Sequence, residues 1–149
     1  MDDSNIIPPD EITLHRMIWH PDCYDEGELT SSGAFRSNDL KGDNFVSVDR
    51  SDLFDIEVVK TRARAQQEKA NGETTFREEA RVIDLHCGAV REIEDAQKLK
   101  PLAVTSEKER DNPAHCGIRN VSGNTGKPYI NRLRAKLMAL RSNEWKIDL

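Results

Sequence analysis

The stretch Pro128-Tyr-Ile-Asn-Arg-Leu-Arg-Ala-Lys-Leu-Met-Ala-Leu-Arg-Ser142 carries the clearest structural signal in the chain. Its large aliphatic residues recur at intervals of three and four positions, a spacing that is typical of a helix with one buried face. Proline suits the first turn of a helix, because its missing N–H would have no partner there. We therefore predict an amphipathic helix with a buried stripe, which consists of Ile130, Leu133, Leu137 and Leu140.

The charges of this predicted helix are positive and lie mostly off the stripe. The chain of 149 residues has net charge −5, yet no acidic residue lies between Asp111 and Glu144. Such a tract can form a face that binds an anion or an acidic partner, or it can be a solvated face that pairs with the acidic N-terminal half. An acidic chain does not favour a dedicated nucleic-acid binder. The candidate binding residues are Lys127, Arg132, Arg134, Lys136 and Arg141.

Alternating polar and apolar residues upstream of the helix predict short strands. The runs are 12–19, 45–49, 80–87, 102–105 and 115–121. A second helix is predicted from about Leu53 to Lys69, because Ser51 or Asp52 can cap its first turn. Strands mixed with helices in this order indicate an α+β fold.

The sequence predicts one α+β domain over residues 11–149, preceded by a flexible acidic tail over residues 1–10. We expect a mainly antiparallel or mixed sheet of about five strands, at least two helices and the basic C-terminal helix. Apolar residues make up 36% of the chain, which is enough for a folded core at this length. No apolar run approaches the roughly 20 residues of a membrane helix, and the acidic N-terminus is unlike a secretory signal. We therefore expect a cytoplasmic protein without membrane partners.

Polar residues interrupt the predicted strands at positions where they could share one face. If that face is a cleft, an arginine could hold an anionic group and a histidine could transfer a proton. The alternative is that these residues form the solvated face of a half-covered sheet. The candidate catalytic residues are His15, Arg16, Ser47, Asp49 and His115.

The three cysteines contain no closely spaced pair, so a disulfide framework is not expected. Zinc needs four converging ligands, and neighbouring residues on a strand point to opposite faces, so each His-Cys dipeptide could donate one ligand. A zinc-stabilised domain stays open as an alternative, but we expect no metal and no cofactor. The residues concerned are His20, Cys23, His86, Cys87, His115 and Cys116.

The loop Gly123-Asn-Thr-Gly126-Lys127 resembles part of a phosphate-binding loop but lacks its defining spacing. Val121 stands where the first glycine is needed, and Pro128 stands where serine or threonine should follow the lysine. The motif of a nucleotide triphosphatase is therefore absent. Free N–H groups at the helix start beside Lys127 would still suit an anion, although an ordinary strand-to-helix loop explains the same residues.

Three short stretches carry a resemblance to known families. They are Leu14-His-Arg16 with Gly33-Ala-Phe35, Phe45-Val-Ser-Val-Asp-Arg50 and Asn112-Pro-Ala-His-Cys-Gly-Ile118. Their order resembles a family of small uncharacterised bacterial proteins with S-V-D-R and N-P-A-H motifs, which implies a bacterial origin and no established activity. The first two stretches also resemble ADP-ribosyltransferase-like folds. Those enzymes carry a glutamate on a late strand, where this chain has His115 and Cys116.

These observations lead to three functional hypotheses. The first is a binding or interaction module whose basic C-terminal helix engages a protein or another anionic partner. The second is a small, transferase-like enzyme that acts on a nucleotide or another anionic substrate through the candidate catalytic residues. The third is the zinc-stabilised domain.

Overall fold

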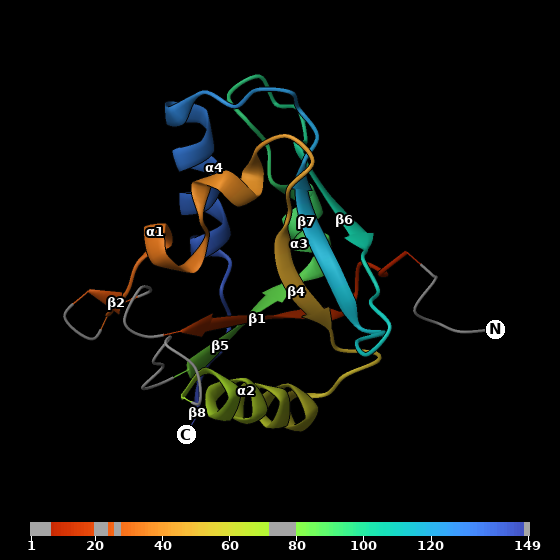
Figure 1. The fold of residues 1–149 in the computed structure, drawn as a ribbon. Helices are drawn as coiled ribbons and strands as arrows, with labels where there is room; N and C mark the ends of the chain where they lie inside the picture. Colours follow the sequence, from red (N-terminus) through yellow and green to blue (C-terminus); the bar gives the residue numbers. More distant parts are fainter. Residues whose placement is uncertain (1–6, 20–23, 26–27, 72–79, 148–149) are drawn as a thin grey trace.

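The computed structural model describes residues 7–19, 24–25, 28–71 and 80–147. Within these residues, six strands form one sheet in the order β6-β7-β4-β1-β5-β8, and all neighbouring strands are antiparallel (Figure 1). The strands are β1 (Thr13–Trp19), β4 (Val46–Arg50), β5 (Ala80–His86), β6 (Leu102–Ser106), β7 (His115–Asn120) and β8 (Glu144–Ile147). A separate two-stranded ribbon consists of β2 (Tyr24–Asp25) and β3 (Glu28–Leu29). The helices are α1 (Ser31–Ala34), the 3-10 helix η2 (Ser37–Leu40), α2 (Ile56–Asn71), α3 (Cys87–Glu92) and α4 (Lys127–Ala139).

The predicted α+β fold is confirmed, and each predicted strand and helix is present. Six short elements were not predicted: β2, β3, α1, η2, α3 and β8. Strand β8 has only four residues and pairs with β5 alone in the described sheet. Helix α3 begins where we expected β5 to continue, because the His86 side chain accepts a hydrogen bond from the Ala89 N–H and caps the helix. Histidine is an uncommon cap, which explains why the pattern did not reveal it.

One face of the sheet is an apolar core that α1, η2, α3 and α4 cover. In Figure 1, α1 and α4 lie side by side at the upper left of the sheet. The predicted stripe of α4 faces this core, with Ile130, Leu133 and Leu137 buried and Leu140 partly buried. Full burial of each such side chain contributes roughly 1.5–3 kcal/mol, so this face supplies much of the stability. We call it the apolar face.

The opposite face is divided between two surroundings. Helix α2 packs Val59 and Ala63 against Ala80 and Val82 of β5, and this cluster covers one end of the face. In Figure 1, α2 runs along the bottom of the molecule, below β1 and β5. The remaining part, toward β4 and β7, carries polar side chains. We call this opposite face the polar face.

Part of the predicted N-terminal tail contacts the folded domain. Of the predicted tail, residues 1–6 lie outside the described residues, and the Asp10 carboxylate binds Arg91 at 2.7 Å. In the described part of the chain, no helix has both the length and the apolar character that crossing a membrane requires.

Candidate functional site

A row of four polar side chains crosses the polar face from β5 to β7. Asp84 lies opposite His15, His15 lies opposite Asp49, and Asp49 lies opposite His115. Directly opposed residues of antiparallel strands project to the same face, with Cβ atoms about 4.5–5.5 Å apart. The register therefore brings four titratable groups from four adjacent strands into one line. We call these four residues the polar row.

The first pair of the row is a buried imidazole and carboxylate. His15 Nδ1 lies 2.6 Å from Asp84 Oδ1, and the two residues are 6% and 4% exposed. The other carboxylate oxygen of Asp84 accepts hydrogen bonds from the Asn143 amide at 3.1 Å and the Trp145 indole at 3.0 Å. Burial by itself would raise the pKa of Asp84, but the hydrogen bonds outweigh it and hold that pKa below its ordinary value.

The ionised state of Asp84 determines which ring nitrogen of His15 carries the hydrogen. An ionised carboxylate can only accept hydrogen bonds, so Nδ1 of His15 carries the hydrogen of the neutral imidazole. Nε2 then holds a lone pair, and no group among the described residues bonds to it. A carboxylate that orients an imidazole in this way prepares Nε2 to take up a proton.

Asp49, the third member of the row, is a buried carboxylate with one side-chain donor. It is 8% exposed, and its Oδ1 accepts from the Asn112 amide at 3.0 Å. The Asn112 carbonyl in turn accepts from the Ala114 N–H at 3.2 Å, which holds the loop before β7 against the row. Within the described residues, Asp49 forms no ion pair and its Oδ2 accepts no hydrogen bond. Burial of an unpaired carboxylate is costly, so Asp49 can bind a donor from a ligand favourably.

His115 closes the row on β7 and is more open than the other members. Its Nδ1 donates to the Glu107 carbonyl at 2.9 Å and lies 3.2 Å from the Glu109 carboxylate. Its ring lies 5.6 Å from the ring of Phe45. A Cβ on Gly117 would lie 2.7 Å from Phe45 ring atoms, so only glycine lets this ring rest on the β7 backbone. These contacts fix the imidazole and leave Nε2 without a partner among the described residues.

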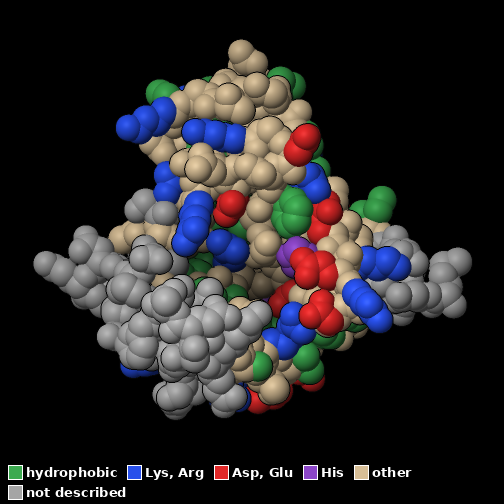
Figure 2. All heavy atoms as spheres, in the orientation of Figure 1, with side chains coloured by type: hydrophobic (Ala, Val, Ile, Leu, Met, Phe, Trp, Pro, Cys, Tyr) green, Lys and Arg blue, Asp and Glu red, His purple; other side chains and the backbone are tan. Residues whose placement is uncertain are grey.

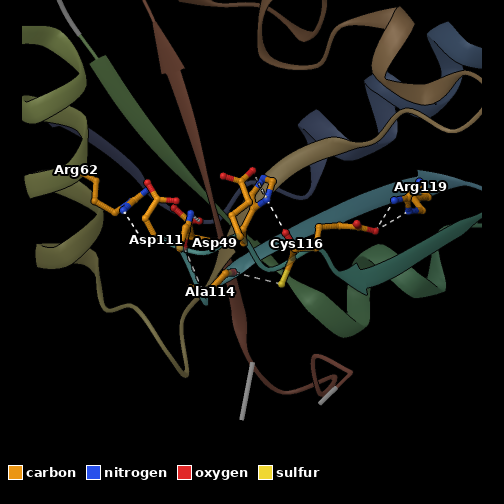
Figure 3. Close-up of polar contacts among 10 residues, drawn as sticks. Asp49, Arg62, Asp111, Ala114, Cys116 and Arg119 are labelled. Carbon is orange, nitrogen blue, oxygen red and sulfur yellow. Dashed lines mark hydrogen bonds and ion pairs between the residues drawn. The ribbon is translucent and has the colours of Figure 1, made fainter. Parts of the chain in front are cut away.

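The charged groups at the rim of the row are already bonded to one another. The Arg119 guanidinium binds the Glu107 carboxylate and also donates to the Asp43 carbonyl at 2.7 Å. Burial would raise the pKa of Glu107, but hydrogen bonds, the strongest from Arg119, lower it below the ordinary value. On the other side, Arg62 of α2 donates to the Asp111 carbonyl at 3.4 Å, and Figure 3 shows Asp49 between these two arginines.

Figure 2 shows a depression near the middle of the molecule, with a histidine and acidic side chains on one side and basic side chains on the other. Mixed charges around a depression suit a polar ligand better than a purely apolar one.

The structure brings together three of the five predicted catalytic residues: His15, Asp49 and His115. Ser47 lies on the same face two residues from Asp49, and its hydroxyl is exposed and forms no hydrogen bond within the described chain. Arg16 shares the apolar face with Leu14 and Ile18 by strand alternation. Its guanidinium donates to the Ala34 carbonyl at 3.2 Å and to the Ser47 carbonyl at 2.9 Å. Arg16 therefore links α1 to the sheet and is separate from the row.

Four residues outside the predicted catalytic set complete this site: Asp84, Asn112, Asn143 and Trp145. Asp84 is the one charged residue within the buried run 82–85 of β5, and this local signal could have drawn attention to it. The other three reach the row from segments that lie 63, 59 and 61 residues away from their partners along the chain. Only the folded register reveals those three.

The basic residues of α4 lie on the other side of the sheet. Arg134 and Lys136 donate to the backbone carbonyls of Phe35 and Glu94. Arg141 donates to the Met138 carbonyl at the end of α4 itself. Lys127 and Arg132 are exposed, and they form no hydrogen bond or ion pair within the described residues. The predicted anion-binding set therefore contains two side chains that are open to a partner.

Metal and thiol chemistry have little support in the described residues. In that part of the chain, no three His, Cys, Asp or Glu side chains are grouped so that they could hold a metal ion. Two of the zinc candidates, His20 and Cys23, lie outside the described residues. Cys87 and Cys116 are buried thiols, and burial raises the pKa of Cys116 to about 12. Cys116 is thus protonated at neutral pH and is a poor nucleophile.

Comparisons with known proteins do not add to this description. No family model matches the chain, and searches of curated proteins and of solved structures found no match either. The resemblance to small bacterial proteins with S-V-D-R and N-P-A-H motifs stays a prediction. The fold and the row define a six-stranded antiparallel α+β domain with a line of buried acid–base groups.

Proposed function

We propose that the protein is a small enzyme whose acid–base chemistry takes place at the polar row. The observation that carries this proposal is the 2.6 Å contact between His15 and Asp84. Asp84 orients the imidazole and stabilises the positive charge that His15 gains when it accepts a proton. His15 is the proton acceptor of the proposed reaction, and its Nε2 is the reacting atom.

The two members of the row beyond His15 provide binding and a second proton-transfer group. Asp49 Oδ2 accepts a hydrogen bond from an N–H or O–H group of the substrate. His115 lies two strands from His15, at a spacing of about 10 Å. In its imidazolium form, in which both ring nitrogens carry a hydrogen, it can donate the Nε2 proton to the far side of a bound molecule and become the neutral Nδ1–H imidazole. This arrangement supports a small polar substrate, from which one proton is removed and to which another is delivered.

The rim residues favour this kind of substrate over a highly charged anion. Arg119 and Arg62 are engaged with Glu107 and the Asp111 carbonyl, so neither is poised for a phosphate. The carboxylates of Asp49 and Glu109 would also repel one. A substrate with hydrogen-bond donors fits these charges better than the nucleotide that the sequence suggested.

A ligand screen tests the proposal. The melting temperature of the wild-type protein is measured against a library of small polar molecules, and hits are then tested for turnover. We expect His15→Gln and Asp49→Asn to abolish the ligand-induced shift or the turnover, with a loss of at least about 100-fold in rate for His15→Gln. His86→Gln is the matched control, since this exposed histidine lies outside the row and a glutamine oxygen can still accept from the Ala89 N–H that His86 caps. Ligand binding and turnover that survive both row substitutions would contradict the proposal.

A second candidate function rests on α4 and is independent of the row. Lys127 and Arg132 are exposed and form no hydrogen bond or ion pair in the described chain, which suits binding of an acidic partner. The probe is poly-glutamate at low and high salt, with single-stranded DNA as a comparison. We expect salt-sensitive binding of the acidic polypeptide that Lys127→Glu combined with Arg132→Glu removes and His15→Gln leaves intact. Equal binding by the charge-reversed variant would reject this function.

A further inference from the structure

We propose that Asn143 and Trp145 are positioning residues, which hold Asp84 so that His15 keeps its hydrogen on Nδ1. The catalytic meaning of this inference rests on the proposed function. The tautomer itself is a property of the folded chain and can be measured without a substrate.

The two oxygens of Asp84 have separate partners. Oδ1 faces His15, whereas Oδ2 receives both the Asn143 amide and the Trp145 indole. Two donors on one oxygen prevent the carboxylate from turning, so the lone pairs of Oδ1 stay available to His15. Backbone hydrogen bonds also fix Asp84 against the segment before β8. The Asp84 N–H donates to the Asn143 carbonyl at 3.0 Å, and the Ser142 N–H donates to the Asp84 carbonyl at 2.9 Å.

Trp145 is itself fixed by its neighbours. It pairs with Val82 across the β5–β8 ladder, and its ring packs against the apolar cluster under α2. The Lys60 ammonium of α2 lies 5.0 Å from the centre of that ring. The indole N–H thus reaches Asp84 from a side chain that cannot easily move away.

The tautomer matters because His15 lies between two carboxylates in the row. Asp84 is its neighbour on β5 and Asp49 is its neighbour on β4. A neutral imidazole carries one hydrogen, and donation toward Asp49 would use Nε2 and remove the proposed proton acceptor. Other charged or titratable groups near this region include His115 on β7, Glu109 before β7, and Lys60 and Arg62 on α2, and none of these bonds to His15 in the described chain. Asn143 and Trp145 therefore bias His15 by making Asp84 the better-placed acceptor.

The test is the tautomer ratio of His15, measured by long-range ¹H–¹⁵N correlation spectra of the full chain at a pH where the ring is neutral. We expect the wild-type ring to be almost entirely in the Nδ1–H form. Trp145→Phe keeps the ring packing and removes the donor, and Asn143→Ala removes the other donor at an exposed position. Each substitution is expected to lower the ratio of Nδ1–H to Nε2–H about fivefold, the effect of one ordinary hydrogen bond.

Trp19→Phe is the matched control, because it makes the same change beside the same apolar cluster and the Asp84 carboxylate accepts no hydrogen bond from Trp19 in the described chain. It should leave the ratio unchanged. If Trp145→Phe does not fold, Asn143→Ala decides the question. Wild-type tautomer ratios in folded donor variants would overturn the inference. A changed ratio, together with activity that survives His15→Gln, would support the positioning role and reject the proposed function.

Discussion

The same strands build both faces of the sheet, but the two faces differ in the buried polar side chains that they carry. On the apolar face, aliphatic residues of β1, β4, β5, β6 and β7 pack under four helical segments. On the polar face, α2 covers one end and the polar row occupies the middle. Alternation along each strand lets one face provide stability while the other carries groups that an apolar core would exclude.

Two neighbouring residues of β4 make this difference concrete. Arg50 on the apolar face is 1% exposed, and its guanidinium binds both carboxylate oxygens of Asp52 at 2.8 Å. The hydrogen bond from Arg50 lowers the pKa of Asp52, so both partners stay charged. Asp49 on the polar face has only the Asn112 amide as its side-chain partner in the described chain. A buried charged group that is fully paired within the chain, such as Arg50, stabilises the fold. A buried carboxylate with one oxygen that accepts no hydrogen bond, such as that of Asp49, can bind a ligand.

The largest expected effect comes from the apolar face. Leu137→Ala should lower the free energy of unfolding by about 2–5 kcal/mol, because it leaves a cavity among fully buried side chains. Ser47→Ala on the polar face should change it by less than about 0.5 kcal/mol. Urea unfolding followed by circular dichroism measures both. A loss below about 1 kcal/mol for Leu137→Ala would show that the apolar face is not the main source of stability.

Loss of Asp84 should be the most damaging change in the row. Asp84→Ala leaves the hydrogen-bonding groups of His15, Asn143 and Trp145 without their acceptor. Unsatisfied buried donors cost about 1–3 kcal/mol each, and partial solvation of Asn143 reduces the sum, so we expect a loss of about 2–3 kcal/mol. The same urea titration measures it, and an unchanged midpoint would contradict the described network.

The Phe45 platform beside His115 should be sensitive to one methyl group. Gly117→Ala places a Cβ 2.7 Å from the Phe45 ring, so the ring must move, and we expect a loss of about 1–2 kcal/mol. In a Phe45→Ala background the same substitution should cost almost nothing. A double-mutant cycle measures this coupling, and additive losses would show that the ring does not rest on β7.

Stability should fall in acid, partly through the polar row. The pKa of Asp84 is lower in the folded chain than the ordinary value near 4, so its contribution is fully present above that value. It is lost as the pH falls below 4 and through the folded pKa, because the unfolded chain binds the proton first. The stability difference between wild type and Asp84→Asn should therefore shrink between pH 6 and pH 2.5. A difference that stays constant over this range would mean that Asp84 does not titrate with folding.

The sequence was sufficient for the fold class because alternation and helical spacing are local. The stripe of α4 and the central strands follow directly from them. The site was only partly predictable, since His15, Asp49 and His115 share a row through pairings between β1, β4 and β7. Such register depends on contacts between residues far apart in the chain. The inclusion of Arg16 beside His15 ignored a local rule, because adjacent strand residues project to opposite faces.

The unfolding free energy of Asp49→Asn at neutral pH tests most directly whether the polar row is a functional site. This substitution keeps the oxygen that accepts from Asn112 and removes the charge that no described residue neutralises. A carboxylate retained for ligand binding costs stability, so we expect the free energy of unfolding to rise by about 0.5–1 kcal/mol while ligand binding is lost. A fall of more than about 1 kcal/mol would show that Asp49 is a structural residue, and it would contradict the assignment of the polar row as a functional site.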